Sequence, residues 1–288
     1  MRSYDEKTGI YFDIRDDGAF VCDSDKGVSE ITIPAEYQGK AVAGILKKAF
    51  LGCRQLRYVK LPETVRTVGQ WAFSSCDALR VVECEKTAIA FEPGAFKGDK
   101  KLERIAVSGE NEMTAQLLAA HVVMEADYLL DIMAAGTSEW IEKWDSKLVS
   151  ILNLKDDDGY HLYVLCGEED LHYDYDQYLE YMRMKKAGLC MLRLLNDMGL
   201  GGELRNRLIA YLLEHTKGCE SEAAWQCILK DHGDDTRYYE LMTQLNCINR
   251  DNLEAVLTDL SDRHAEAKSY LLNAFSEDKG DYFEELFL

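Results

Sequence analysis

The sequence lacks any apolar run that approaches the roughly 18 uninterrupted residues of a membrane-spanning helix. Its first residues, MRSYDEKTGIYFDIRDD, mix charges with apolar side chains where a secretion signal needs a continuous apolar segment. We therefore expect a cytoplasmic protein with no membrane insertion. Cysteines number nine, but they are scattered and include no Cys-x-x-Cys pair, which indicates reduced thiols rather than a disulfide framework.

Motifs that carry catalysis are also missing. There is no Gly-x-Ser-x-Gly nucleophile motif and no His-Glu-x-x-His metal motif. The segment Gly199–Gly202 lacks the Lys-Ser/Thr ending of a phosphate-binding loop and the strand that should precede it, so a turn between helices is the better interpretation. The sequence therefore predicts no cofactor and no enzyme, and a catalytic role is only the third hypothesis.

Two segments suggest metal sites but have the wrong ligands. Asp156–Gly159 suggests a calcium loop, yet Leu154 and Leu165 then occupy the first and twelfth ligand positions, where carboxylates are required. Cys166 and His172 supply only two ligands, whereas a structural zinc site has four. We therefore expect no bound metal.

Positive charge is scarce in the second part of the chain. Residues 1–110 hold 17 Lys+Arg and 17 Asp+Glu, so residues 111–288 hold the remaining 16 basic and 35 acidic residues and the whole net charge of −19. Such a surface repels phosphate backbones and anionic lipids, which disfavours nucleic acids and membrane surfaces as partners. The excess charge serves solubility or attracts a basic partner.

The sequence does contain an internal repeat with a period of 23 residues. The pair Ala-Phe recurs at Ala49-Phe50, Ala72-Phe73 and Ala95-Phe96. A fixed period of this length predicts a solenoid, in which each turn buries its apolar residues against its neighbours. Four further apolar columns keep the same register, namely Ile45, Val68 and Phe91; Leu56, Leu79 and Leu102; Val59, Val82 and Ile105; and Leu61, Cys84 and Val107.

Each repeat is expected to supply one short β-strand whose alternate residues point inward. Stacking the repeats places Phe50, Phe73 and Phe96 over one another, so that the core becomes one continuous column. Cys53 and Cys76 share a repeat position beside this column, and we interpret them as buried packing residues rather than nucleophiles. The predicted strands are 31–33, 59–61, 82–84 and 105–107.

The end of a solenoid exposes unpaired backbone and apolar side chains, so it needs a cap. Residues 10–22 are suited to the N-terminal end, because two apolar runs flank the turn Asp16–Gly18 and predict a β-hairpin. We therefore predict a first domain over 1–110, a solenoid with an N-terminal hairpin cap.

The run AFLGCRQLRYVKLPETVRTVGQWAFSSCDALRVVEC resembles the BspA-type leucine-rich repeat of bacterial proteins, and the resemblance covers about residues 28–107. It implies a right-handed solenoid of short parallel strands and a role in protein recognition, often surface adhesion when a secretion signal is present. The last copy departs from the pattern, with Asp99 where Cys53 and Cys76 stand and Val107-Ser108 where Leu-Pro is expected. We expect the stack to end there.

Beyond Pro93 there is no proline, and apolar residues recur at spacings of three and four, as in Leu204, Leu208, Tyr211 and Leu212. We therefore predict an acidic all-helical domain over 111–288 that caps the C-terminal end of the stack, and an α+β fold for the chain. The run LEAVLTDLSDRHAEAKSYLLNAF resembles an ankyrin-like helix pair. Candidate helices are 112–122, 125–135, 138–152, 174–198 (as one helix or two), 203–215, 221–230, 235–246, 250–260, 263–274 and 280–287.

The outward residues of the predicted strands form a first candidate binding surface. Tyr58, Lys60, Glu83 and Arg104 belong to two adjacent columns on this face. Tyr and Arg are enriched at binding hot spots, which favours Tyr58 and Arg104 as contacts for a protein partner. The alternative is that Lys60 and Glu83 form a solvated cross-strand pair without a binding role.

A second candidate is a segment in which tyrosines alternate with acids. It could hold a basic peptide or a cationic ligand, but tyrosines that pack between helices beside solvated acids explain the pattern as well. Its members are Tyr160, Tyr163, Tyr173, Tyr175, Tyr178 and Tyr181, with Asp157, Asp158, Glu168, Glu169, Asp170, Asp174 and Asp176.

Together these features predict a non-enzymatic protein–protein interaction module, a repeat scaffold that binds an unknown protein partner. The alternative is an adhesin-like cell-surface binding protein, which fits the resemblance but lacks a secretion signal in this sequence.

Overall fold

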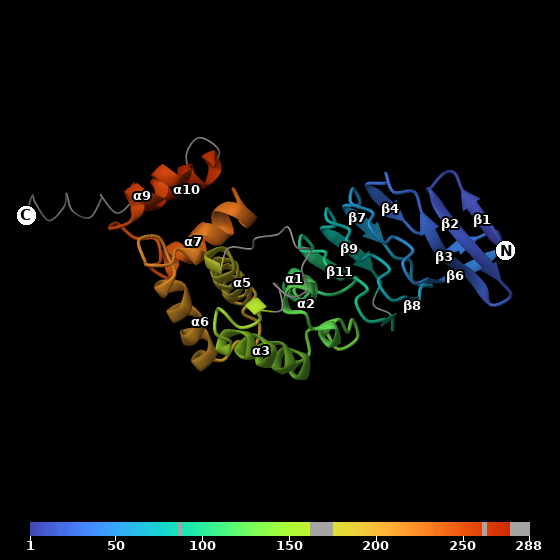
Figure 1. Cartoon of the computed structure of the whole chain (residues 1–288), viewed down its shortest axis with the longest axis horizontal. Helices are drawn as coiled ribbons and strands as arrows, with labels where there is room; N and C mark the ends of the chain where they lie inside the picture. Colours follow the sequence, from blue (N-terminus) through green and yellow to red (C-terminus); the bar gives the residue numbers. More distant parts are fainter. Residues whose placement is uncertain (86–87, 162–174, 261–263, 277–288) are drawn as a thin grey trace, which may run out of the picture. The chain divides into compact units, whose positions relative to one another are not determined.

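The computed structural model describes residues 1–85, 88–161, 175–260 and 264–276. The chain forms two compact units, Met1–Ser150 (unit 1) and Ile151–Leu288 (unit 2). The fold class is α+β, as predicted, with a β-solenoid followed by helices (Figure 1). The division lies later than the predicted domain boundary at residue 110, because the first helix after the strands packs on the last strand of the solenoid.

The larger sheet of unit 1 begins with antiparallel strands and continues with parallel ones. β1 pairs with β2 and β2 with β3, both antiparallel, which confirms the hairpin predicted at 10–22 and adds a strand before it. β3 then pairs in parallel with β6, which is followed by β8 and β10, while β5 pairs antiparallel with β6. The strands are β1 (Arg2–Asp5), β2 (Ile10–Arg15), β3 (Gly18–Ser24), β5 (Glu36–Tyr37), β6 (Lys40–Ile45), β8 (Thr67–Val68) and β10 (Ala90–Phe91).

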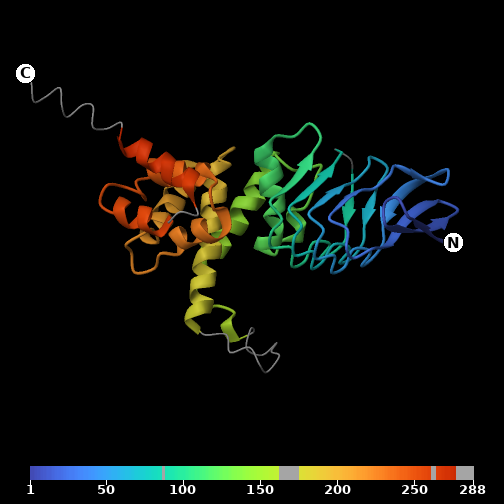
Figure 2. The same cartoon turned by 90° about the horizontal axis from the view of Figure 1, so that it is seen from above.

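The smaller sheet contains the four repeat strands, all parallel and in register. Tyr58 lies beside Val81 and Val81 beside Arg104, so equivalent repeat positions are direct neighbours. Figure 2 shows the turns of the solenoid stacked in chain order, as the colours run from blue to green. The predicted strands are confirmed to within one residue as β4 (Glu30–Thr32), β7 (Tyr58–Lys60), β9 (Val81–Cys84) and β11 (Arg104–Val107).

The core of the solenoid is the predicted phenylalanine column. The Phe50 and Phe73 rings stack with centroids 4.8 Å apart, and those of Phe73 and Phe96 stack at 5.2 Å, with both ring pairs within 4° of parallel. All three side chains are at most 1% exposed. Cys53 and Cys76 are fully buried beside the column, as expected of small packing residues.

A group of helices closes the C-terminal end of the stack within unit 1. α1 (Glu112–Ala119) packs against β11, and its first turn is capped by the Asn111 side chain, which accepts a hydrogen bond from the Thr114 N–H. The buried ring of His121, in α2 (His121–Met124), meets the edge of Phe96 with centroids 5.9 Å apart. The indole N–H of Trp144, in α3 (Ser138–Asn153), donates to the Leu117 carbonyl at 3.0 Å. The predicted helical cap therefore exists, formed by residues 111–150.

The helix predicted at 125–135 is wrong. Glu125 has a left-handed backbone (φ 52°) that ends α2, and only the short 3-10 helix Asp127–Leu129 follows. The Asp131 carboxylate then accepts the backbone N–H groups of Met133 and Ala134, which is a turn and not a helix.

Unit 2 consists of helices joined by turns and irregular segments, and its described residues contain no strand. Its longest helix, α5, packs against α6 and α7, and Trp225 and Tyr239 are fully buried in its core. A π-helical turn, Ile228–His232, continues α7. The helix predicted at 280–287 lies outside the described residues. The helices are α5 (Tyr175–Leu195), α6 (Gly202–Glu214), α7 (Ala223–Cys227), α8 (Thr236–Gln244), α9 (Leu253–Leu260) and α10 (Ala265–Ser276). In the described residues, no helix is both long and apolar enough to span a membrane.

Candidate functional site

Three of the four predicted site residues meet on the outer face of the four-stranded sheet. Tyr58 and Lys60 lie on β7, and Glu83 lies on the neighbouring strand β9. The Tyr58 hydroxyl donates to Glu83 Oε2 at 2.7 Å, and Lys60 Nζ lies 3.6 Å from the same oxygen. The Lys60 side chain is 48% exposed and that of Glu83 35%, so the pair is accessible to solvent. Lys60 and Glu83 therefore do form a cross-strand pair, and the same two side chains are candidate contact residues.

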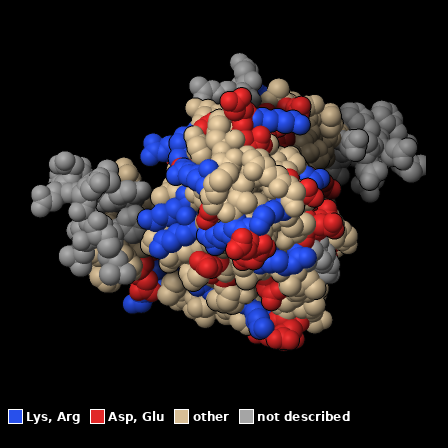
Figure 3. Space-filling model, turned by 90° about the vertical axis from the view of Figure 1, so that its right-hand side faces the viewer, with Lys and Arg blue, Asp and Glu red and all other residues tan. Residues whose placement is uncertain are grey.

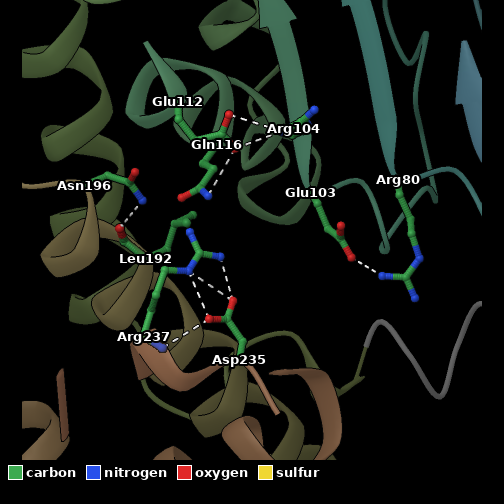
Figure 4. A network of polar contacts seen from close by, with 9 residues as sticks. All are labelled: Arg80, Glu103, Arg104, Glu112, Gln116, Leu192, Asn196, Asp235 and Arg237. Atoms are coloured by element: carbon green, nitrogen blue, oxygen red, sulfur yellow. Dashed lines mark hydrogen bonds and ion pairs between the residues drawn. The ribbon is translucent and has the colours of Figure 1, made fainter. Parts of the chain in front are cut away.

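Arg104, the fourth residue, points to a different partner. Its Nη1 donates to both carboxylate oxygens of Glu112 on α1, at 3.2 and 3.4 Å (Figure 4). Its Nε is buried and has no hydrogen-bond partner among the described residues, although the side chain as a whole is 39% exposed. Arg104 thus joins the sheet face to the helix that covers the end of the stack.

Tyr58 stays protonated well above neutral pH. Partial burial and the bond to the Glu83 carboxylate raise the pKa of Tyr58 to about 12. At neutral pH the hydroxyl therefore remains a neutral donor, and the face presents an ordered Tyr–Glu–Lys row rather than free side chains.

The surface around this row is mixed in charge. Glu30 and Thr32 on β4 are exposed beside Tyr58 and Lys60. At the adjoining rim, Arg80 donates to Glu103 (Figure 4). Figure 3, which looks toward the end of unit 1 that carries β1, shows Lys and Arg side chains interspersed with Asp and Glu. This pattern agrees with the balanced charge of residues 1–110 and suits the recognition of a protein surface.

The tyrosine-rich segment is only partly described, and three of its described tyrosines contact one another. The Tyr160 ring contacts those of Tyr175 and Tyr178 at centroid distances of 5.0 and 5.3 Å. Tyr178 is 3% exposed and its hydroxyl donates to the Asp158 carbonyl at 2.6 Å. These contacts favour the packing interpretation for these three rings. The remaining candidates at 163–174, including Tyr163 and Tyr173, lie outside the described residues.

The acidic run Asp156–Gly159 is occupied by other contacts. Asp156 accepts hydrogen bonds from Lys186 Nζ and Arg183 Nε, both at 2.8 Å. Asp158 accepts one from the Lys155 N–H at 2.7 Å. Within the described part of the chain, no group of three or more His, Cys, Asp or Glu side chains is arranged to hold a metal ion, and the pair Cys166 and His172 falls outside that part.

Sequence reasoning overlooked one exposed feature, the rim around Trp71. Trp71 has a left-handed backbone (φ 56°), as do the equivalent residues Lys48 (φ 64°) and Gly94 (φ 71°) of the neighbouring repeats. A bulky residue rarely adopts this conformation, which costs roughly 1–2 kcal/mol outside glycine. The glycine at position 94 was the available signal, because a shared repeat position implies a shared backbone conformation.

With this geometry in place, the comparisons with known proteins become informative. The BspA type leucine rich repeat region matches residues 18–118, in 6 copies. No curated protein matches the chain.

Three solved bacterial structures are each similar to 37–38% of the chain. One is a leucine-rich repeat protein of T. pallidum, with 21% identity and a TM-score of 0.28, covering 37% of this chain and 65% of that one. Another is a leucine rich cell surface protein from Faecalibacterium prausnitzii, with 23% identity and a TM-score of 0.33, covering 38% and 32%. The third is a leucine-rich repeat protein from Bacteroides capillosus, with 20% identity and a TM-score of 0.29, covering 38% and 99%. This chain therefore spans less than two thirds of the first two proteins. Its 23-residue period, its in-register parallel strands and the family match together identify residues 18–118 as a BspA-type leucine-rich repeat region.

Proposed function

We propose that this chain is a non-enzymatic protein-interaction module whose partner docks on the outer face of the four-stranded sheet. The observation that carries the proposal is the ordered row of Tyr58, Glu83 and Lys60, which stays partly exposed beside Arg104. Leucine-rich repeat regions generally serve as protein-interaction or surface-binding modules, which is the coarser function that the family match supports.

The physical advantage of this face is its rigidity. Parallel strands in register hold the backbone, and the hydrogen bond from Tyr58 to Glu83 holds the aromatic ring before a partner arrives. A side chain that is already ordered loses less conformational entropy on binding than a free one, so each contact contributes more to affinity. Tyr and Arg supply large contact areas with hydrogen-bonding ends, which suits them to the centre of an interface.

The test is partner capture with matched variants. Immobilised full-length chain is used to capture proteins from the native host, and the captured set is compared with that of a Tyr58→Ala, Arg104→Ala variant. Specific partners should be lost in the variant. A Tyr4→Ala, Arg2→Ala variant removes the same residue types from β1, so it should still capture the specific partners. If the Tyr58/Arg104 variant keeps every partner, the four-stranded face is not the binding site.

We further propose that the module acts in the cytoplasm. Buried thiols such as Cys84, Cys190 and Cys227 are unpaired, which suits a reducing compartment. Burial raises the pKa of Cys84 and Cys190 to about 12, so both remain protonated and unreactive. Fractionation of native cells with an antibody against this chain separates the proposal from the surface-protein alternative, since the latter places the chain with the cell envelope.

A further inference from the structure

Trp71 differs from the other tryptophans of this chain. Trp140, Trp144 and Trp225 are at most 2% exposed, and each donates its indole N–H, to a carbonyl or a carboxylate. Trp71 is half-buried, and in the described part of the chain its N–H has no hydrogen-bond partner. A donor that the fold leaves unused is available to a ligand.

Two lysines flank this ring and are not neutralised. Lys47 Nζ lies 4.9 Å from the centroid of the Trp71 ring and Lys48 Nζ lies 5.1 Å from it. Both side chains are exposed, and neither forms an ion pair with any described carboxylate. The ring therefore concentrates two positive charges at one point on the surface.

Two acidic side chains accept hydrogen bonds from backbone N–H groups at this rim. Glu92 Oε2 accepts the Gln70 N–H at 2.8 Å, and Asp127 Oδ2 accepts the Gly94 N–H at the same distance. These bonds tie both carboxylates to the backbone beside the ring. Neither carboxylate forms an ion pair with Lys47 or Lys48 in the described residues, so the two ammonium groups and the indole N–H remain as donors beside the ring.

The fold also holds the ring in place. A Cβ at Gly94 would lie 2.7 Å from Trp71 Cδ1, so the ring packs directly on the glycine of the next repeat. A Cβ at Gly69 would lie 2.5 Å from the Lys47 backbone nitrogen, so the chain on either side of this rim is closely packed. Strained backbone that the surrounding structure enforces is found preferentially at sites with a function.

We propose that Lys47, Lys48 and Trp71, hereafter the Trp71 site, bind an acidic peptide segment of a partner protein. Carboxylates of the segment pair with the two lysines, the indole N–H donates to a carbonyl or carboxylate oxygen, and the exposed ring covers an adjacent side chain. A nucleic acid suits the site less well, because only two lysines are there to meet its phosphates, whereas a peptide segment needs no more than two carboxylates to pair with them.

The Trp71 site shares no residue with the four-stranded face. An experiment that rejects one of the two proposed binding sites therefore leaves the other untouched. The test is fluorescence anisotropy of a fluorescein-labelled octaglutamate peptide titrated with the full-length chain at low ionic strength. The peptide should bind, and binding should weaken by roughly tenfold in a Lys47→Ser, Lys48→Ser variant. A Lys100→Ser, Lys101→Ser variant removes an equal charge from another adjacent pair of exposed lysines and should bind as the parent does.

Trp71→Gly provides the second variant, because glycine adopts the left-handed backbone without strain and already occupies the equivalent position 94. This variant should fold, which circular dichroism will test, and it should no longer bind the labelled octaglutamate peptide. Acrylamide quenching gives an independent readout in the parent chain, since the other three tryptophans are buried. Bound peptide should shield the accessible indole and lower the quenching constant.

Several outcomes would overturn the proposal. These are no binding of octaglutamate, equal weakening by the two lysine-pair variants, or unchanged quenching with bound peptide. Tighter binding of a labelled oligothymidylate would assign the site to nucleic acid instead. Self-association of the parent chain in sedimentation velocity, lost in Trp71→Gly, would assign it to a second copy of this chain.

Discussion

The backbone N–H of Cys76 donates to Oδ1 of Asp99 at 2.8 Å, while the other carboxylate oxygen of Asp99 has no hydrogen-bond partner among the described residues. Asp99 is fully buried and takes the place in the last repeat that Cys53 and Cys76 take in the earlier ones. Burial raises the pKa of Asp99 to about 9, so at neutral pH the carboxyl group is protonated in the folded chain.

This protonation makes stability depend on pH. In the unfolded chain the Asp99 carboxyl ionises near its ordinary pKa, whereas in the folded chain it ionises only near pH 9. Between these two pH values the folded state binds one more proton than the unfolded state. The contribution of Asp99 is therefore complete below about pH 4 and declines as pH rises toward 9, by at most about 1.4 kcal/mol per unit. Asp99→Asn should flatten the pH dependence of the urea unfolding midpoint over this range. Asp77→Asn removes an exposed carboxylate that contributes less than burial to the raised pKa of Asp99, so it should change the pH dependence much less.

Phe73 should be the most costly of the three stacked rings to remove. It lies between Phe50 and Phe96, so its truncation to Ala deprives both neighbours of a contact. We expect Phe73→Ala to lower the free energy of unfolding by roughly 3–5 kcal/mol, measured by urea denaturation. Phe73→Leu, which keeps most of the volume, should cost clearly less. Equal effects of the two variants would mean that ring stacking, and not filled volume, stabilises the column.

A comparison of Gly94 with Gly39 separates the cost of a left-handed backbone from the cost of a collision with Trp71. Both have left-handed backbones, with φ of 71° and 75°, but a Cβ at Gly39 meets nothing within 4 Å. Gly39→Ala should therefore cost about 1–2 kcal/mol for the backbone alone. Gly94→Ala should cost more, because its Cβ collides with Trp71. Thermal unfolding of the two variants measures the difference, and equal losses would contradict the contact described for Trp71.

Asp156 compensates a buried cation in unit 2. Lys186 is 4% exposed and donates to Asp156 Oδ1 and to the Leu154 carbonyl. Burial alone would raise the pKa of Asp156, but the hydrogen bonds from Lys186 and Arg183 outweigh it and lower the pKa. Its stabilising contribution is thus present above the ordinary carboxyl pKa and lost as pH falls through the lowered value.

Asp156→Asn should accordingly cost roughly 3 kcal/mol in urea unfolding, because it leaves a buried ammonium without its carboxylate. An additional Lys186→Met change should restore most of that loss. The exposed pair of Asp197 and Arg205 is the control, since Asp197→Asn should change stability by less than about 1 kcal/mol.

The sequence alone predicts most of unit 1 because its signal is repeated. The column of Phe50, Phe73 and Phe96 repeats the same buried position three times, so the four strands of the smaller sheet and the core follow to within one residue, whereas β1, β5, β6, β8 and β10 are not predicted. The helices at 111–150 carry no repeat, and their attachment to β11 depends on contacts between residues distant in sequence. The boundary predicted at 110 therefore lies before the observed division at Ser150.

The contacts of the candidate site are likewise only partly predictable from the sequence. The contact of Lys60 with Glu83 follows from strand register, which the period defines. The pairing of Arg104 with Glu112 does not, because it depends on how α1 packs. Trp71 escaped notice because its own residue type does not indicate a left-handed backbone, and the only signal was the glycine at the equivalent repeat position 94.

The packing of α1 against β11 prevents a further strand from being added to the parallel sheet at this edge. A parallel sheet with a bare last strand is a template onto which another molecule can add its own strand, and repeated addition yields fibres. Here a helix of the same chain occupies that edge. The number of turns is thereby set within one polypeptide, and filament growth from the β11 edge is blocked without the help of a second subunit.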